Sequence, residues 1–163
     1  MFVDSKDLKV LIKKCEEQER TLQFDRFTNK DALTLGMMLV EHADENKFAV
    51  VIDINVNGYQ LFRYGFTGTN IHNDMWINRK INTVNTVHKS TLHTGAILMD
   101  MGEDIGTDWH LDPNDYAFHG GGFPITLKGA GVIGSICVSG MPHEQDHQII
   151  IDVLEKYFEK DVN

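Results

Sequence analysis

The segment with the clearest chemical potential is HEQDH, residues 143–147, which matches the pattern H-E-x-x-H. On a helix this spacing places His143 and His147 on one face, where they could bind zinc while Glu144 acts as general base. A zinc protease also needs a third ligand, and the longer motif H-E-x-x-H-x-x-G-x-x-H finds neither its glycine nor its last histidine here. We therefore expect HEQDH to be the head of a closing helix and not a protease site.

A second motif resembles half of a calcium-binding loop. Asp53, Asn55 and Asn57 alternate and are followed by Gly58, as in the first half of an EF-hand loop. The loop must end in a bidentate glutamate at its twelfth position, where this chain has Tyr64. The flanking residues are also typical of strands, so we expect a hairpin turn here and no calcium site.

A third motif, GAGVIG at residues 129–134, has the spacing G-x-G-x-x-G. In a dinucleotide site these glycines open a helix whose N-terminus binds the pyrophosphate. Here the following residues are SICVS, which are typical of a strand. The glycines therefore indicate a tight turn and a close strand crossing.

Composition limits the classes of protein to which the chain can belong. With 163 residues, 42% of them hydrophobic, it is large enough for one compact domain with its own core. A net charge of −9 without a basic cluster argues against a nucleic-acid partner. The two cysteines, Cys15 and Cys137, are too few for a disulfide framework or a cysteine zinc site.

The first residues, MFVDSKDLKV, are charged and lack the apolar core of a signal peptide. No segment approaches the ~18 apolar residues that a membrane-spanning helix needs. We therefore expect a cytoplasmic protein without a membrane partner.

Hydrophobic periodicity predicts an N-terminal helix over residues 5–20 and a short strand over 21–27. Thr28 is a predicted N-cap for a second helix, which carries Leu33, Met37 and Val40 on one side. Residues 48–66 form two β-rich runs around Asn57-Gly58, a dipeptide typical of a two-residue hairpin turn.

The second half of the chain repeats this order of helices and hairpin. Residues 69–101 have a helical pattern, with Ser90 and Gly95 indicating a break into two helices. A long loop then leads to a second hairpin, FPITLK and VIGSICVS, and to a final helix over 143–158. This order predicts an α+β fold in which helices flank an antiparallel sheet of about five strands. Residues 1–27 would add a helix and the first strand to the domain formed by 28–163.

The segment GGGFPITLKGAGVIGSICVSGMPHEQDHQIIIDVLE closely resembles the haem-degrading, GlcG-like (HbpS-like) domain family. The helix INRKINTVNT is similar to the family's helix, and LDPNDYAFHGGGFPI is similar to a subgroup of uncharacterised proteins attached to this family. The resemblance covers about residues 28–158. Residue by residue, it extends to the following positions in the helix, the loop and the C-terminal segment: Lys80, Thr83, Gly121, Gly122, Pro124, Gly134, Ser139, Gly140 and Asp146.

This resemblance implies a profilin-like arrangement, frequent homo-oligomerisation and a pocket that takes a tetrapyrrole or another small molecule in some members. Haem is therefore the cofactor to test. Among the eight histidines, His119, His143 and His147 cluster at the loop and the final helix and are the candidate metal or haem-iron ligands.

Other residues are candidates for contacts with the ligand. Trp109 and Tyr116 lie in the same loop as His119, where aromatic rings could flank a flat molecule. Lys80, next to Arg79 in the helix, is a candidate for holding a carboxylate such as a haem propionate. Asp146 could instead favour the positive start of the last helix.

The sequence thus favours a small-ligand-binding domain, with haem or a related tetrapyrrole as the ligand, over an enzyme. Two alternatives stay open. One is a haem-degrading or metal-dependent enzyme that uses the histidine cluster, and the other is an oligomeric assembly protein that docks partners without catalysis.

Overall fold

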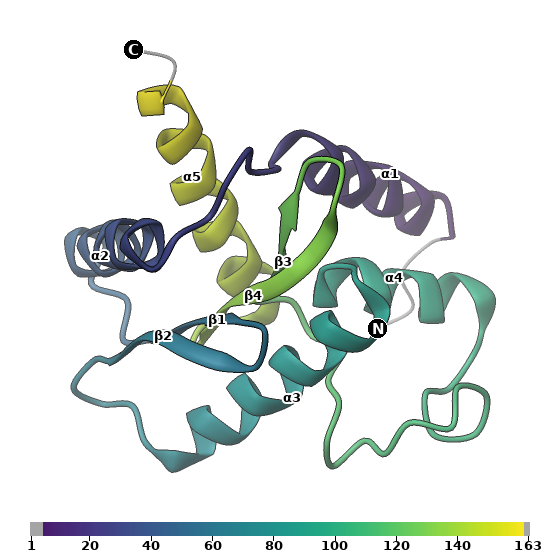
Figure 1. The fold of residues 1–163 in the computed structure, drawn as a ribbon. Helices are drawn as coiled ribbons and strands as arrows, with labels where there is room; N and C mark the ends of the chain where they lie inside the picture. Colours follow the sequence, from purple (N-terminus) through teal and green to yellow (C-terminus); the bar gives the residue numbers. More distant parts are fainter. Residues whose placement is uncertain (1–4, 162–163) are drawn as a thin grey trace.

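The structure, a computed structural model, describes residues 5–161. The start of the N-terminal stretch and the outer ends of the two predicted parts, residues 1–4 and 162–163, lie outside the described residues. The elements follow in this order: α1 (Ser5–Thr21), α2 (Asn29–Glu45), β1 (Val51–Val56), β2 (Tyr59–Gly65), α3 (Ile71–Val87), α4 (Thr91–Met101), β3 (Gly122–Leu127), β4 (Gly131–Ser139) and α5 (His143–Asp161) (Figure 1). The predicted α+β fold is confirmed.

The strands form one antiparallel sheet in the order β2-β1-β4-β3. Each hairpin is closed by a short turn. Asn57 and Gly58 have φ of 51° and 77°, the positive values that the two-residue turn requires. The central pair is β1 with β4, so the two hairpins join through their inner strands.

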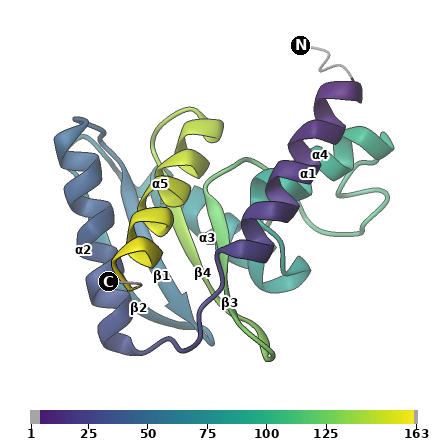
Figure 2. The same cartoon turned by 90° about the horizontal axis from the view of Figure 1, so that it is seen from above.

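Alternation along the inner strands divides the core between two layers of helices. Ile52 and Ile54 of β1 face α2 and α5, which bury Leu35 and Ile150 on the same side. Val51 and its neighbours on the other face pack against α3. Figure 2 shows α2 and α5 on one side of the sheet, and α1 beside α4 at its end.

The predicted strand over 21–27 is wrong, and the sheet has four strands where about five were expected. Only Phe24 bridges to Leu127 of β3, through backbone bonds to Thr126 and Lys128. Its side chain is 2% exposed, with ring centroids 4.9 Å from those of both Phe27 and Phe158. One buried aromatic anchor is enough to fix this segment without a ladder of hydrogen bonds.

Helix caps confirm the predicted boundaries. Thr28 caps α2 in a capping box with Asp31, and Ser90 caps α4 after a left-handed residue at His88. The side of α2 that carries Leu33 and Met37 is solvent-facing, since each of these side chains is 54% exposed.

Both cysteines are free thiols buried in the core. None of the helices within residues 5–161 has the length and apolar character needed to cross a bilayer.

Candidate functional site

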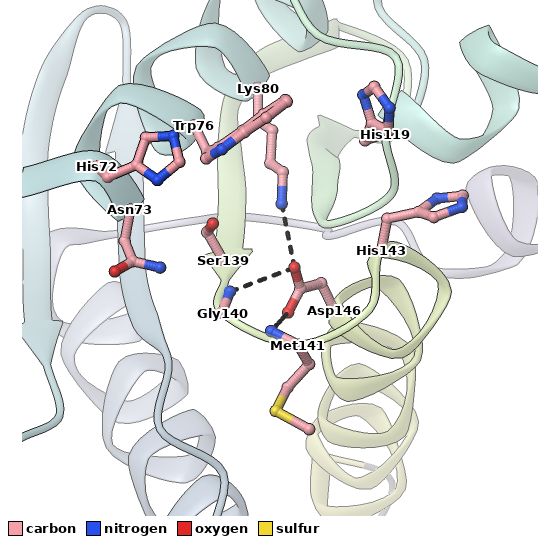
Figure 3. Close-up of a pocket in the computed structure, with 10 residues that line it drawn as sticks. All are labelled: His72, Asn73, Trp76, Lys80, His119, Ser139, Gly140, Met141, His143 and Asp146. Atoms are coloured by element: carbon pink, nitrogen blue, oxygen red, sulfur yellow. Dashed lines mark hydrogen bonds and ion pairs between the residues drawn. The ribbon is translucent and has the colours of Figure 1, made fainter. Parts of the chain in front are cut away.

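A cleft of about 280 Å³ opens between the first half of α3, the end of the long loop and the start of α5 (Figure 3). Histidine and tryptophan rings form its walls, and an ion pair forms its floor. The lining residues are His72, Asn73, Trp76, Lys80, His119, Ser139, Gly140, Met141, His143 and Asp146.

The floor of the cleft is the pair Lys80 and Asp146. The two side chains are each 3% exposed, and Lys80 Nζ lies 3.2 Å from Asp146 Oδ2 while donating a 2.8 Å bond to the Val138 carbonyl. The carboxylate also accepts from the backbone N–H groups of Met141 and Gly140. Burial raises the pKa of Asp146, and the charge of Lys80 opposes this rise. The aspartate thus fills the anion cradle at the start of α5, and Lys80 keeps it ionised.

Gly121 and Gly122, two positions of the family motif, make room for this floor. Gly121 has φ of 116°, and a Cβ there would lie 2.6 Å from Lys80 Nζ. A Cβ on Gly122 would lie 2.8 Å from the Thr91 methyl group. These glycines therefore permit the close approach of the loop to α3 and do not themselves face the cleft.

His143 stands at the rim with one ring nitrogen already engaged. Its Nδ1 accepts a 3.1 Å hydrogen bond from the backbone N–H of Gly120. In the neutral ring this places the proton on Nε2, so the nitrogen that could face a ligand is a donor.

His119 faces the cleft with its ring 5.3 Å from Trp76 and 5.7 Å from His143, both in edge contacts. Across residues 5–161, no group forms a hydrogen bond with this imidazole. Partial burial lowers the pKa of His119, and the nearby His143 and Lys80 charges lower it further. The ring is therefore neutral near pH 7, with a free lone pair.

His147 lies outside the cleft, although HEQDH places it next to the other histidines. Its ring is buried, and Nε2 lies 2.8 Å from Gln18 Oε1 of α1. Nδ1 is buried without a hydrogen-bond partner. Burial lowers the pKa of His147 to about 4, and the charges of Lys14 and His143 add to this effect.

The remaining predicted contact residues shape the long loop. Thr83 accepts a 3.1 Å bond from the Ala117 backbone, and Arg79 donates a 2.9 Å bond to the Asn114 carbonyl. Trp109 donates to Glu103 within the loop. Neither Trp109 nor the half-buried Tyr116 lines the cleft.

Three lining residues, His72, Asn73 and Trp76, were not predicted as candidates. The spacing of His72, Trp76 and Lys80, four residues apart on α3, places them on one face of the helix. That stripe was visible in the sequence and could have identified this wall of the cleft.

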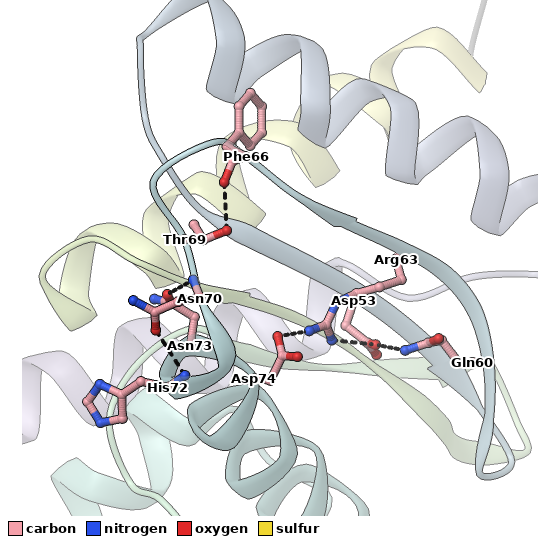
Figure 4. A network of polar contacts seen from close by, with 9 residues as sticks. All are labelled: Asp53, Gln60, Arg63, Phe66, Thr69, Asn70, His72, Asn73 and Asp74. Carbon is pink, nitrogen blue, oxygen red and sulfur yellow. Dashed lines mark hydrogen bonds and ion pairs between the residues drawn. The ribbon is translucent and has the colours of Figure 1, made fainter.

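The calcium-like motif is part of a structural network. Asp53 is buried on β1, accepts a 2.7 Å bond from Gln60 and lies 3.4 Å from Arg63, which also pairs with Asp74 of α3 (Figure 4). Burial raises the pKa of the Asp53 carboxyl. Within the described part of the chain, no three His, Cys, Asp or Glu side chains are grouped to hold a metal ion.

Comparisons with known proteins agree with this fold. The family model described as Haem degrading protein HbpS-like matches residues 27–155. The UPF0303 protein SCO2848 of Streptomyces coelicolor is 43% identical over 142 residues, which cover 87% of this chain and 90% of the relative. The crystal structure of Ybr137w protein has a TM-score of 0.87 and 28% identity, covering 100% of both chains.

The crystal structure of the PduOC:Heme complex is a more distant neighbour. It has a TM-score of 0.67 and 21% identity, covering 79% of this chain and 93% of that one, and this likeness concerns the fold alone. The match to the family model over most of the chain, together with the UPF0303 relative, shows the family. The chain therefore belongs to the family described as haem-degrading, HbpS-like proteins.

Proposed function

We propose that this protein binds haem or a related tetrapyrrole in the cleft, with His119 as the iron ligand. The family description supports haem as the ligand, and the PduOC:Heme complex shows that one protein with this fold is known with heme. When bound, the iron would supply the redox chemistry, whereas the protein residues would bind and orient the ligand.

The observation that carries the proposal is the free imidazole of His119. An axial ligand must offer an accessible nitrogen lone pair. His143 has its lone pair on Nδ1 turned to Gly120, and His147 is buried against Gln18. Of the three candidate histidines, His119 alone offers such a lone pair to the cleft.

The walls of the cleft suit one part of a flat molecule. Its volume of about 280 Å³ is at the lower end of the ~300–1,000 Å³ usual for ligand pockets, so a tetrapyrrole would insert partly and extend beyond it. Lys80 is already paired with Asp146, so we assign it to the floor and not to a propionate. Arg79, whose guanidinium lies 5.0 Å from the Trp76 ring centroid, has no carboxylate partner among residues 5–161 and could pair with one.

A hemin titration followed by absorbance in the Soret region tests this function. We expect a sharp, saturable band for the wild type and, for His119→Ala, a broadened band with affinity weaker by roughly tenfold or more. His72→Ala is the matched control, because His72 is an exposed histidine that lines the same cleft. It should keep the band of the wild type.

Three superimposable titrations would remove His119 from the proposal. Loss of the band in His72→Ala alone would move the iron to the other wall. A featureless spectrum for the wild type would refute haem binding altogether.

We further propose that the protein self-associates, as the family resemblance implies. Strand β2 is at the edge of the sheet, with unpaired backbone groups on its outer side. Beside it, Leu33, Met37 and Tyr64 expose apolar surface, and an edge strand can pair with its own copy across a twofold axis. Sedimentation equilibrium should give a lower mass for Met37→Glu than for the wild type. A wild type that sediments as a monomer at all concentrations would contradict this.

A further inference from the structure

A second cavity, of about 310 Å³, lies on the other side of the two rim histidines. His119 and His143 line both it and the cleft, so the two spaces share a wall. Its other lining residues come from α4 and from the two sides of the long loop: Gly95, Leu98, Met99, Glu103, Asp104, Ile105 and Phe118. The cleft and this cavity, which we call the α4 cavity, therefore form one site in two parts.

The α4 cavity differs from the cleft in its chemistry. Leu98 and Ile105 are buried in its wall, and Met99 is 53% exposed beside them. Its only charged lining groups are the carboxylates of Glu103 and Asp104. Glu103 accepts a 2.7 Å bond from Trp109, and Asp104 accepts from the backbone N–H groups of Gly106 and Thr107.

These carboxylates set the orientation of a ligand that spans both parts. Backbone hydrogen bonds lower the pKa of Asp104, so its charge persists at neutral pH and disfavours a second carboxylate nearby. On the opposite side, Arg79 and His72 of α3 offer a cation and a neutral or cationic ring. An amphiphilic ligand would thus bind with its apolar edge at α4 and its acidic edge at α3.

We infer that the α4 cavity is the subsite for the apolar edge of an amphiphilic flat ligand whose carboxylates point toward α3. This inference rests on the proposed function, because His119 stands between the two parts. It adds the direction in which the ligand lies and a preference for tetrapyrroles that have one edge free of carboxylates.

Two exposed methionines of α4 allow a matched test. Met99 lines the α4 cavity, whereas Met101, 59% exposed on the same helix, lines neither part of the site. We expect Met99→Gln to weaken hemin binding by roughly fivefold, as loss of a partly buried methionine contact implies. Met101→Gln should leave the affinity unchanged.

A second probe tests the direction in the wild type. Iron uroporphyrin, which carries carboxylates on every edge, should bind at least roughly tenfold more weakly than hemin, because one acidic edge must face Asp104 and Glu103. Hemin binding that is equal in Met99→Gln, Met101→Gln and wild type would refute the subsite while leaving haem binding intact. Failure of the wild type to bind hemin would refute both.

Discussion

Replacing Lys80 by methionine is expected to lower the free energy of unfolding by about 3–5 kcal/mol at pH 7, because it leaves the buried Asp146 carboxylate without its partner. The ion pair is almost completely buried, and the raised pKa of Asp146 shows that its environment already disfavours the ionised form. Chemical denaturation of the variant and the wild type measures the difference.

Two variants make this test specific to burial. Lys128→Met removes a pair of similar length, 3.1 Å to Asp25, whose side chains are 57% and 86% exposed, and it should cost less than about 1 kcal/mol. Lys80→Met combined with Asp146→Asn should recover part of the loss, because no unpaired charge is then buried. If Lys80→Met costs no more than Lys128→Met, the floor of the cleft does not depend on this pair.

The second large effect is sensitivity to acid through His147. Its pKa is lowered from 6.5 to about 4 in the folded protein, whereas the unfolded chain would protonate it near 6.5. Between these values the unfolded state binds more protons, so stability falls as the pH falls. The contribution is fully present above pH 6.5, and about 3 kcal/mol is lost once the pH has fallen through about 4.

The variant His147→Gln isolates this contribution. A glutamine can still donate to Gln18 but does not titrate, so its unfolding free energy should fall less steeply between pH 6.5 and 4 than that of the wild type. Asp53 and Asp146, whose pKa values are raised, act in the opposite direction in both proteins and cancel in the comparison. Parallel pH profiles would show that His147 is protonated as easily in the folded protein as in the unfolded chain.

Local signals in the sequence predicted most of the fold. Asn57-Gly58, Thr28 and Ser90 each mark a turn or cap by the chemistry of their own side chains or backbone, so neighbouring residues were enough to identify them. The strand expected over 21–27 failed because alternation also suits an extended segment held by one buried ring, that of Phe24.

The candidate site was less predictable because its properties depend on contacts between distant segments. The sequence named Lys80, His119, His143 and Asp146, which the structure brings together. It could not show that Lys80 is buried, since this follows from the position of Val138 and Asp146, more than fifty residues later. Nor could it distinguish the three histidines, because their hydrogen bonds to Gly120 and Gln18 are tertiary contacts.

The central claim is that the cleft between α3, the long loop and α5 is the ligand site. Its most direct test is the backbone amide NMR spectrum of the labelled protein during addition of gallium protoporphyrin, a diamagnetic counterpart of hemin. The account predicts that the largest shifts occur in residues 72–80, 118–121 and 139–143, with smaller ones in α4. Shifts centred instead on α2 and β2, or a spectrum unchanged at saturating ligand, would contradict it.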